Sequence, residues 1–364
     1  MRKWTLRALR AHAAGRSLRP AASLAGAIAA MRFVQIDPIR APARAADLIL
    51  RQRVAGYRAG DLDAAYAGLD VAEGHLHVYG VMPESARELL HPRVGDCRFR
   101  VEREHPRLAS RVLAHVAANG DTHPRDLDSI GRARTVNGWG SQSAATTRIL
   151  EALHFRGRLR VARRDNGIKV YALAPSPRPS GPQAAASRAR SILLLLLDVY
   201  APLPEASFRE LARMVADSAL PSLRGRAFEA FLADPALQRI AIDGMSWLLP
   251  ARELPVEPDR CVRFLAPFDP VVWDRRRFQA LWGWEYRLEA YTPPPRRKFG
   301  YYALPLLWRD DVVGWVNAKA ANGTLAITAD YVRAAPRGAA FRRELAAEAE
   351  RLRACLGASR VELR

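Results

Sequence analysis

Apolar and polar residues follow two different periods along this 364-residue chain, and the change comes near residue 255. Before that point, most segments repeat apolar residues every three or four positions, as amphipathic helices do. After it, several short runs alternate apolar and polar residues with the period of two that strands show. The pattern predicts a largely helical N-terminal part and a C-terminal α+β domain at residues 255–364, so the expected fold class is α+β.

The clearest module spans residues 104–175. Its expected helices and strands lie at Leu108–Ala118, Thr122–Ile130, Ser143–Arg156, Leu159–Arg163 and Lys169–Leu173. Asp165–Gly167 supplies a hairpin turn between the two strands. Three helices followed by a hairpin indicate a winged helix, which in DNA-binding proteins places its third helix in the major groove. Arg148, Arg163 and Arg164 would then meet phosphates; a winged helix used only for packing is the alternative.

Two further segments suit the same architecture more weakly. Residues 1–103 are expected to hold helices and an extended run at Leu6–Ala13, Ala21–Met31, Phe33–Ile39 and Ala43–Leu50, with Arg44 as a candidate DNA contact. A linker rich in Pro, Ser and Ala at 174–186 precedes the third block, residues 187–254. Its expected helices are Arg188–Tyr200, Ser207–Ala216 and Gly225–Leu232, and a hairpin is expected within Gln238–Leu249.

The C-terminal domain is expected to contain strands at Arg260–Phe264, Tyr286–Tyr291, Tyr302–Trp308, Val312–Ala318 and Leu325–Tyr331, a helix at Arg337–Leu356 and a last strand at Ser359–Leu363. Two of its segments place basic residues beside aromatic ones, a mixture that contacts phosphates and stacks on bases. The candidate contacts are Trp273, Arg275, Arg276, Arg296, Arg297, Lys298 and Tyr301. A solvated basic turn beside core aromatics is the alternative for either segment alone.

The net charge changes this picture most. Lys and Arg number 57 against 37 Asp and Glu, which gives a formal charge of +20. Arginine stays protonated and its planar fork matches phosphate geometry, so a polyanionic partner, above all nucleic acid, is expected. A GC-rich genome would explain arginine in place of lysine, but not the excess over acidic residues.

Other features narrow the class. The three cysteines, Cys97, Cys261 and Cys355, are far apart and lack metal-ligand spacing, so neither a metal site nor a disulfide framework is expected. The longest apolar run, Ile192–Leu197, is too short to cross a membrane. The N-terminus leads into an Arg-rich stretch rather than an apolar secretory segment. A cytoplasmic, nucleoid-associated protein without membrane contact is the expectation, and nothing in the sequence demands a dimer.

Candidate chemistry lies in the run Phe33–Ile39. In an extended run, residues two apart share a face, so Gln35 and Asp37 would point outward while Val34 and Ile36 face the core. An amide and a carboxylate held together could orient a water molecule and take its proton. A strand edge with polar residues turned to solvent is the alternative, because such a pair is common.

Four segments in the same order resemble the YcaQ/AlkZ-type DNA glycosylases. They are Gln35–Asp37, His77 with Pro83 six residues later, Phe268–Arg276, and Pro293–Pro305. The similarity spans nearly the whole chain, and the two C-terminal segments are the most specific. Two positions depart from the family pattern: Val-Tyr-Gly follows His77, and Asn317 stands where an Asp is expected before Lys319.

The resemblance implies tandem winged-helix domains in a C-shaped arrangement with a β-containing C-terminal part, and no metal or organic cofactor. It implies that Gln35 and Asp37 are catalytic and that His77 belongs to the DNA-binding set. The expected reaction is hydrolysis of the N-glycosidic bond of N7-alkylated purines and unhooking of interstrand crosslinks in double-stranded DNA, by a monomer without a protein partner. A winged-helix transcription regulator without catalysis is the alternative.

Overall fold

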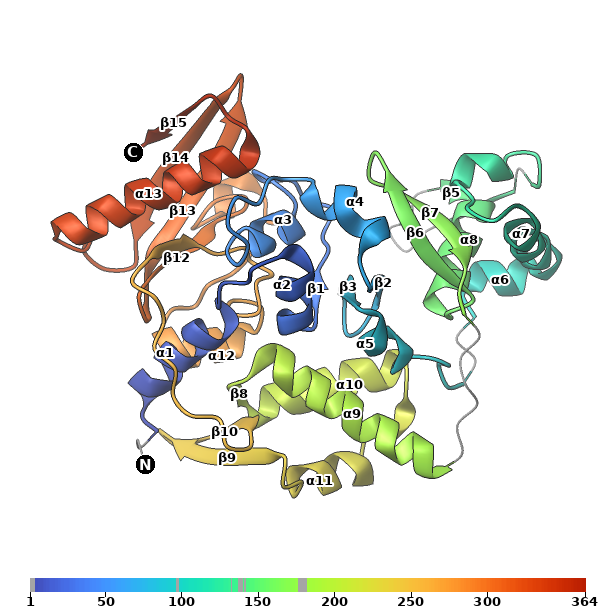
Figure 1. Ribbon diagram of the computed structural model, residues 1–364, viewed down its shortest axis with the longest axis horizontal. Helices are drawn as coiled ribbons and strands as arrows, with labels where there is room; N and C mark the ends of the chain where they lie inside the picture. Colours follow the sequence, from blue (N-terminus) through green and yellow to red (C-terminus); the bar gives the residue numbers. More distant parts are fainter. Residues whose placement is uncertain (1–3, 96–97, 132, 137–139, 141, 176–181) are drawn as a thin grey trace. The chain divides into compact units, whose positions relative to one another are not determined.

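The computed structural model describes residues 4–95, 98–131, 133–136, 140, 142–175 and 182–364. These residues form a mixed α/β fold whose elements are labelled in Figure 1. The chain divides into two compact units, each built from segments that are distant in sequence. The first unit comprises Met1–Leu62, Leu193–Ala212 and Phe228–Arg364, and the second comprises Asp63–Ile192 and Arg213–Ala227.

A five-stranded sheet dominates the C-terminal part of the first unit. Its strands, in spatial order, are β11 (Val262–Phe264), β12 (Leu304–Trp308), β13 (Asp311–Ala321), β14 (Thr324–Tyr331) and β15 (Arg360–Leu363). Helix α13 (Ala339–Leu356) lies along this sheet in Figure 1 and provides the crossover that the parallel pair β14–β15 requires. The predicted strands and helix at these positions are confirmed.

The strand predicted at Tyr286–Tyr291 is wrong. This segment is irregular, and the buried side chain of Tyr286 packs with Phe278 and Trp284 rather than on a pleated sheet. The Tyr286 hydroxyl donates a hydrogen bond to the carbonyl oxygen of Ala303 at 2.7 Å. The two tyrosines of this segment favoured a strand in the sequence, but the prolines at 293–295 and the aromatic cluster decide otherwise.

Short helices surround the N-terminal segment of the first unit. They are α1 (Leu6–Ser17), α2 (Leu24–Met31), α3 (Ala45–Leu50) and α12 (Arg275–Trp282). Ser23 caps the start of α2 by accepting a bond from the Gly26 amide at 3.0 Å, and Arg32 ends it with a left-handed backbone. Apolar residues of α1 and α12 share one core, which also contains Trp247.

The remaining elements of the helical block are also close to their predicted places. Strands β8 (Leu203–Pro204), β9 (Leu237–Ile242) and β10 (Met245–Pro250) form a small sheet, and the chain turns at Asp243–Gly244 with positive φ. The helices are α9 (Pro182–Tyr200), α10 (Glu205–Ser218) and α11 (Arg226–Leu232). Helix α9 begins inside the predicted linker, and residues 176–181 lie outside the described part.

The second unit contains the first and third predicted helices of its winged-helix module and the predicted hairpin, but the helix predicted at Thr122–Ile130 is wrong, because only the 3-10 turn Pro124–Leu127 forms there. Its elements are β2 (Val71–His75), β3 (Tyr79–Pro83), α5 (Glu84–Glu88), α6 (Arg100–Glu104), α7 (Pro106–Asn119), the 3-10 turn η2 (Pro124–Leu127), β4 (Arg134–Val136), β5 (Gln142–Ala144), α8 (Ala145–Phe155), β6 (Leu159–Asp165) and β7 (Ile168–Leu173). Asn166 and Gly167 adopt the positive φ values that the hairpin turn needs. The β2–β3 and β4–β5 hairpins were not predicted.

Short connecting elements complete the description. Helix α4 covers Asp61–Ala65, and 3-10 turns lie at η1 (Tyr66–Gly68), η3 (Pro221–Leu223) and η4 (Pro294–Arg296). None of the helices among the described residues is long and apolar enough to cross a bilayer.

Candidate active site

The run Phe33–Ile39 is extended for a shorter distance than its pattern predicts. Only Val34 and Gln35 form a strand, β1, and Phe33 and Val34 are fully buried. Gln35 is itself buried, with 8% of its surface exposed, while Asp37 lies half-buried beyond the strand. The buried apolar residues therefore hold the segment in the first unit, and their packing fixes the positions of Gln35 and Asp37.

Asp37 has an incompletely satisfied carboxylate. Its Oδ1 accepts a hydrogen bond from the backbone amide of Ile39 at 2.9 Å, which closes a turn around Pro38. No second donor to this carboxylate is found among the described residues. Burial raises the pKa of Asp37, and the Ile39 amide opposes that rise in part. The result is a carboxylate that binds a proton more readily than an ordinary aspartate.

Gln35 carries a buried amide oxygen that accepts no hydrogen bond from the described residues. Native proteins rarely leave buried polar atoms unpaired, and such atoms often mark a functional site. An amide offers one acceptor and two donor positions, so it can hold a water molecule in a fixed orientation. Asp37 and Gln35 thus place a half-buried carboxylate and a buried amide oxygen two residues apart.

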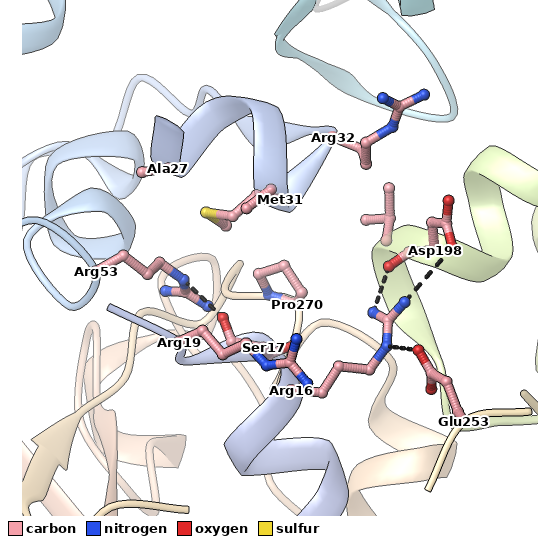
Figure 2. A pocket seen from close by; sticks show the side chains of 12 residues that line it. Arg16, Ser17, Arg19, Ala27, Met31, Arg32, Arg53, Asp198, Glu253 and Pro270 are labelled. Carbon is pink, nitrogen blue, oxygen red and sulfur yellow. Dashed lines mark hydrogen bonds and ion pairs between the residues drawn. The ribbon is translucent and has the colours of Figure 1, made fainter. Parts of the chain in front are cut away.

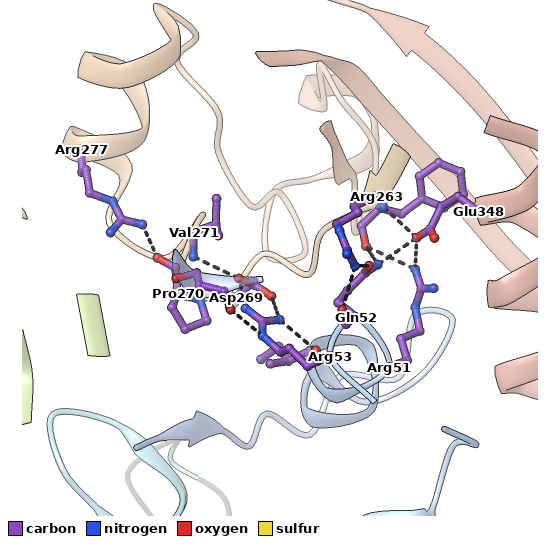
Figure 3. Close-up of polar contacts among 12 residues, drawn as sticks. Arg51, Gln52, Arg53, Arg263, Asp269, Pro270, Val271, Arg277 and Glu348 are labelled. Atoms are coloured by element: carbon purple, nitrogen blue, oxygen red, sulfur yellow. Dashed lines mark hydrogen bonds and ion pairs between the residues drawn. The ribbon is translucent and has the colours of Figure 1, made fainter. Parts of the chain in front are cut away.

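A buried ion pair holds the surroundings of this segment in place. Helix α3 packs beside β1 and ends at Leu50. In the turn that follows, the Arg53 guanidinium donates to both carboxylate oxygens of Asp269 at 2.5 and 3.0 Å (Figure 3). Arg53 also donates to the carbonyl oxygens of Ile49 and Ser17. Oδ1 of Asp269 also accepts a hydrogen bond from the Val271 amide at 3.0 Å.

A second buried carboxylate lies next to the first. Glu348 of α13 accepts hydrogen bonds from Arg51 at 2.6 Å and Gln52 at 2.8 Å (Figure 3). It also accepts from the Phe264 amide at 2.9 Å and from Arg351 at 2.9 Å. Burial alone would raise the pKa of Glu348, but the two arginines and these hydrogen bonds outweigh it and lower the pKa. The network ties α3 to the five-stranded sheet.

Two candidate DNA contacts follow the segment Phe268–Pro270: Arg276 is exposed, whereas Arg275 is partly buried. The Arg275 guanidinium donates to the carbonyl oxygens of Val272 at 2.6 Å and Pro267 at 3.0 Å, and it lies over the ring of Tyr286. Arg275 therefore holds the loop through these contacts, and its expected role as a phosphate contact stays a prediction. Trp273 is partly buried against Tyr200, with ring centroids 5.0 Å apart.

The second basic segment surrounds the 3-10 turn η4. Arg296 and Lys298 are exposed, and the side chain of Tyr301 is 45% exposed. Arg297 donates to the Thr292 carbonyl oxygen at 2.7 Å and lies 5.1 Å from the centre of the Tyr301 ring. Arg296, Lys298 and Tyr301 therefore remain accessible to a ligand, while Arg297 supports the turn.

The candidates of the second unit divide in the same way. Arg164 forms a buried ion pair with Glu73, donating at 2.6 Å to each carboxylate oxygen, so it does not face solvent as expected. Burial lowers the pKa of His77 to about 3, so its imidazole is neutral near pH 7 and adds no charge for phosphates. Arg163 pairs with Asp121 and Asp165 but is 42% exposed.

Two candidates on helices are also engaged within the protein. Arg148 of α8 pairs with Glu151 and is 29% exposed. It lines a pocket with Arg98, Arg100 and Arg103, so this part of the second unit is strongly basic. Arg44 precedes α3 and contacts Asp47 at 3.4 Å, with 17% of its side chain exposed. Neither pair is bidentate and fully buried, unlike those of Arg53 and Arg164.

A separate pocket of about 260 Å³ adjoins the end of α2 (Figure 2). Arg16 crosses it, donating to Glu253 at 2.8 Å and to the carbonyl oxygen of Asp198 at 2.5 Å. Arg32 lines the same pocket, but its side chain points away from Arg16 in Figure 2. Gln35 and Asp37 do not line it, so the pocket is distinct from the candidate active site.

Sequence reasoning missed the residues that support the site. Asp269 lies in the segment Phe268–Arg276 that resembles the family, yet its partner Arg53 lies 216 residues earlier. Tyr302 lies in the segment Pro293–Pro305, which also resembles the family, and has a buried hydroxyl without a partner among the described residues. The only sequence signal for either was its place in a segment shared with a known family. Among the described residues, no group of three or more His, Cys, Asp or Glu side chains could hold a metal ion.

Comparison with known proteins adds two findings. A family model described as "DNA glycosylase AlkZ-like" matches residues 28–355. The structure is also similar to the DNA glycosylase AlkZ of Streptomyces sahachiroi, with a TM-score of 0.63 over 100% of both chains and 15% sequence identity. At this identity the structural similarity concerns the fold, while the family model covers both the candidate active site and the C-terminal segments.

Proposed function

Because this chain belongs to the AlkZ-like DNA glycosylase family, we propose that it excises N7-alkylated purines from double-stranded DNA with Asp37 and Gln35 as its catalytic residues. Family membership makes the chain a DNA glycosylase, with DNA as its partner, and decides against the transcription regulator. The observation that carries the residue assignment is the pairing of an under-satisfied carboxylate at Asp37 with an unpaired amide oxygen at Gln35.

The chemistry of the substrate determines what the enzyme must supply. Alkylation at N7 places a positive charge on the purine, so the base leaves without much help from an acid. The sugar then develops oxocarbenium character, as in glycoside hydrolysis generally. A nearby carboxylate stabilises that cation and accepts a proton from the attacking water. Asp37 has this role, and its raised pKa makes it a better base than an ordinary aspartate.

Gln35 orients the water that attacks C1′ of the sugar. Its amide accepts a hydrogen bond from the water through Oε1 and donates another through Nε2. The run Phe33–Ile39 contains no lysine that could form a Schiff base. The reaction is therefore hydrolytic and monofunctional, leaving an abasic site with an intact backbone.

Winged-helix domains would present this site to DNA. The order α7, η2, α8 and the β6–β7 hairpin supports a winged helix at residues 104–175. The exposed basic and aromatic residues Arg276, Arg296, Lys298 and Tyr301 are the best-placed DNA contacts, and Arg148 and Arg163 can add to them. An interstrand crosslink cannot be flipped whole into a closed pocket, so unhooking would need contacts of this open kind.

The decisive experiment measures abasic-site formation under single-turnover conditions on a duplex that contains N7-methylguanine. We expect Asp37→Asn to slow excision by about 10²- to 10⁴-fold, because the base is removed. Asp311→Asn is the matched control, since burial also raises the pKa of Asp311 but that residue lies in β13 outside the candidate site. Excision by Asp37→Asn at the wild-type rate would refute the assignment.

A second duplex tests the crosslink activity separately. It carries a covalent link between N7 positions of purines on opposite strands, and release of single strands after heating reports unhooking. Wild-type protein is expected to release both strands, and Asp37→Asn is not. Excision of the monoadduct without any unhooking would restrict the proposed substrate to single alkylated bases.

A further inference from the structure

Tyr302 is a buried tyrosine whose hydroxyl has no partner among the described residues. Only 4% of its surface is exposed, and its ring packs edge-on against Phe268 with centroids 6.3 Å apart. A hydroxyl that is removed from water and makes no hydrogen bond is costly, and this cost is usually tolerated where a ligand or a moving group supplies the partner. Tyr302 therefore needs an acceptor that the described residues do not provide.

The loop before Tyr302 is firmly built. The carboxylate of Glu289 accepts hydrogen bonds from the amides of Lys298, Phe299 and Gly300 at 3.0, 2.7 and 3.2 Å. Gly300 has a φ of +119°, and a Cβ atom there would lie 2.2 Å from the side-chain oxygen of Asn317. Asn317 in turn donates to the Phe299 carbonyl oxygen at 2.8 Å. The position of Tyr302 is thus fixed by its own loop.

The charged and titratable groups whose charges act on the Tyr302 hydroxyl are Asp37, Tyr286, Arg275 and Tyr301. Burial raises the pKa of Tyr302, and the charge of Asp37 raises it further, so the two side chains interact and the hydroxyl stays protonated. Arg275 opposes the rise, but it is a donor whose bonds go to Val272 and Pro267. Tyr286 already donates to Ala303. Asp37 is the one carboxylate in this set.

We infer that Tyr302 is a positioning residue for Asp37, whose carboxylate accepts a hydrogen bond from the Tyr302 hydroxyl when DNA is bound. The inference rests on the proposed function of Asp37. Catalytic hydrogen bonds are often long in the unbound enzyme and tighten in the substrate complex. The Tyr302 bond would occupy the Asp37 oxygen that does not contact Ile39, and it would aim the carboxylate at the water held by Gln35.

The bond has a measurable consequence for the pH dependence. A donor to the ionised carboxylate stabilises that form and lowers its pKa in the complex. In Tyr302→Phe the pKa of Asp37 is therefore expected to rise. The acid limb of the pH–rate profile, where the single-turnover rate falls as Asp37 becomes protonated, then moves to higher pH by about one unit. The rate above that limb falls by about 10- to 100-fold, because the carboxylate is less well oriented.

Tyr286→Phe is the matched control. It removes a hydroxyl that is equally buried but bonded to the Ala303 backbone. This variant is expected to lower the melting temperature and to leave the acid limb where it is in the wild type. A wild-type rate and an unmoved limb in Tyr302→Phe, with Asp37→Asn inactive, would overturn the inference and leave the proposed function intact. An active Asp37→Asn would instead remove the proposed function.

A fluorinated tyrosine incorporated at position 302 covers the case in which Tyr302→Phe does not fold. It keeps the ring and the hydroxyl but makes the hydroxyl a stronger donor. The acid limb is then expected to move to lower pH, opposite to the shift in Tyr302→Phe. An unmoved limb in the folded fluorinated protein would contradict the hydrogen bond.

Discussion

The first unit holds carboxylates in two contrasting environments. Asp269 is fully buried, and its oxygens accept bonds from both arms of Arg53 and from the Val271 amide. Asp37 is half-buried, and among the described residues its carboxylate receives one hydrogen bond, from the Ile39 amide. The first arrangement fixes the position of a loop, and the second leaves capacity for a substrate or a water molecule. The number of satisfied hydrogen bonds, rather than burial alone, separates the structural carboxylate of Asp269 from the proposed catalytic carboxylate of Asp37.

The largest expected effect comes from breaking the structural pair. Asp269→Ala leaves the Arg53 guanidinium buried without its partner, which typically costs about 3–5 kcal/mol of unfolding free energy. Urea denaturation checks this value. The double variant Arg53→Met with Asp269→Leu is expected to recover much of the lost stability, since both charges are removed together. A single variant as stable as the wild type would show that the pair does not hold the loop.

The next effect concerns Gln35. Gln35→Ala is expected to slow excision by about 10- to 100-fold without a comparable loss of stability, because a water-orienting bond is lost and no buried partner is left unpaired. Single-turnover rates and melting temperatures, measured on the same preparation, separate the two. Gln238 also has a buried, unpaired side-chain oxygen and provides the control variant Gln238→Ala. Equal loss of rate in both variants would argue against a specific role for Gln35.

A smaller effect concerns the stability of the active-site carboxylate itself. Burial raises the pKa of Asp37, so the folded state disfavours its ionised form. That penalty is absent below the unfolded-state pKa of about 4 and is complete above the folded-state pKa. Asp37→Asn is therefore expected to be slightly more stable than the wild type at pH 7, and the difference should vanish at acid pH. Thermal unfolding across this pH range measures it.

Glu348 is expected to change stability with pH in the opposite direction to Asp37, and the same thermal unfolding experiment measures it. Its pKa is lowered in the folded state, so it contributes stability above its unfolded-state pKa that is lost as pH falls through the folded value. Glu348→Gln is therefore expected to lower stability most at neutral pH. If both variants changed stability with the same pH dependence, the contrast between the two kinds of carboxylate would fail.

The smallest effects concern the exposed cations. Arg276→Ala and Lys298→Ala are each expected to weaken DNA binding modestly and to reduce the slope of log affinity against log salt by about one, since each lost phosphate contact retains one counterion. Arg343 on α13 is also exposed, at 74% of its side chain, and Arg343→Ala is the control. Fluorescence anisotropy with one duplex at several salt concentrations measures the slopes. An equal change in the control would place the effect in net charge alone.

Local signals in the sequence were sufficient for much of the secondary structure. The Asn166–Gly167 turn, the apolar stripes of α7 and α8, and the strand alternation in β13 and β14 all have the predicted form. These features depend on neighbours a few residues away, so one sequence contains the information. The strand expected at Tyr286–Tyr291 failed because the packing of Tyr286 against Phe278 and Trp284, which an alternating pattern does not reveal, determined its conformation.

The candidate site was predicted only in part for the same reason. The pair Gln35 and Asp37 could be found from its spacing and from a family resemblance. The sequence could not show whether an arginine faces solvent. Arg164 and Arg275 look like exposed cations in the sequence, but both bind other groups within the fold. Net charge identified nucleic acid as the partner class without identifying which cations are accessible.

The sequence by itself determined most of the helices, the hairpin turns and the positive charge, and it singled out Gln35 and Asp37 as candidates, because each of these features is set by composition or by residues close in the chain. The tertiary structure decided which carboxylates are satisfied and which are not. Arg53 reaches Asp269 across 216 residues, and Arg51 reaches Glu348 across 297. Desolvation and hydrogen bonding at Asp37 arise from such distant packing, so its raised pKa and its relation to Tyr302 exist only in the folded protein.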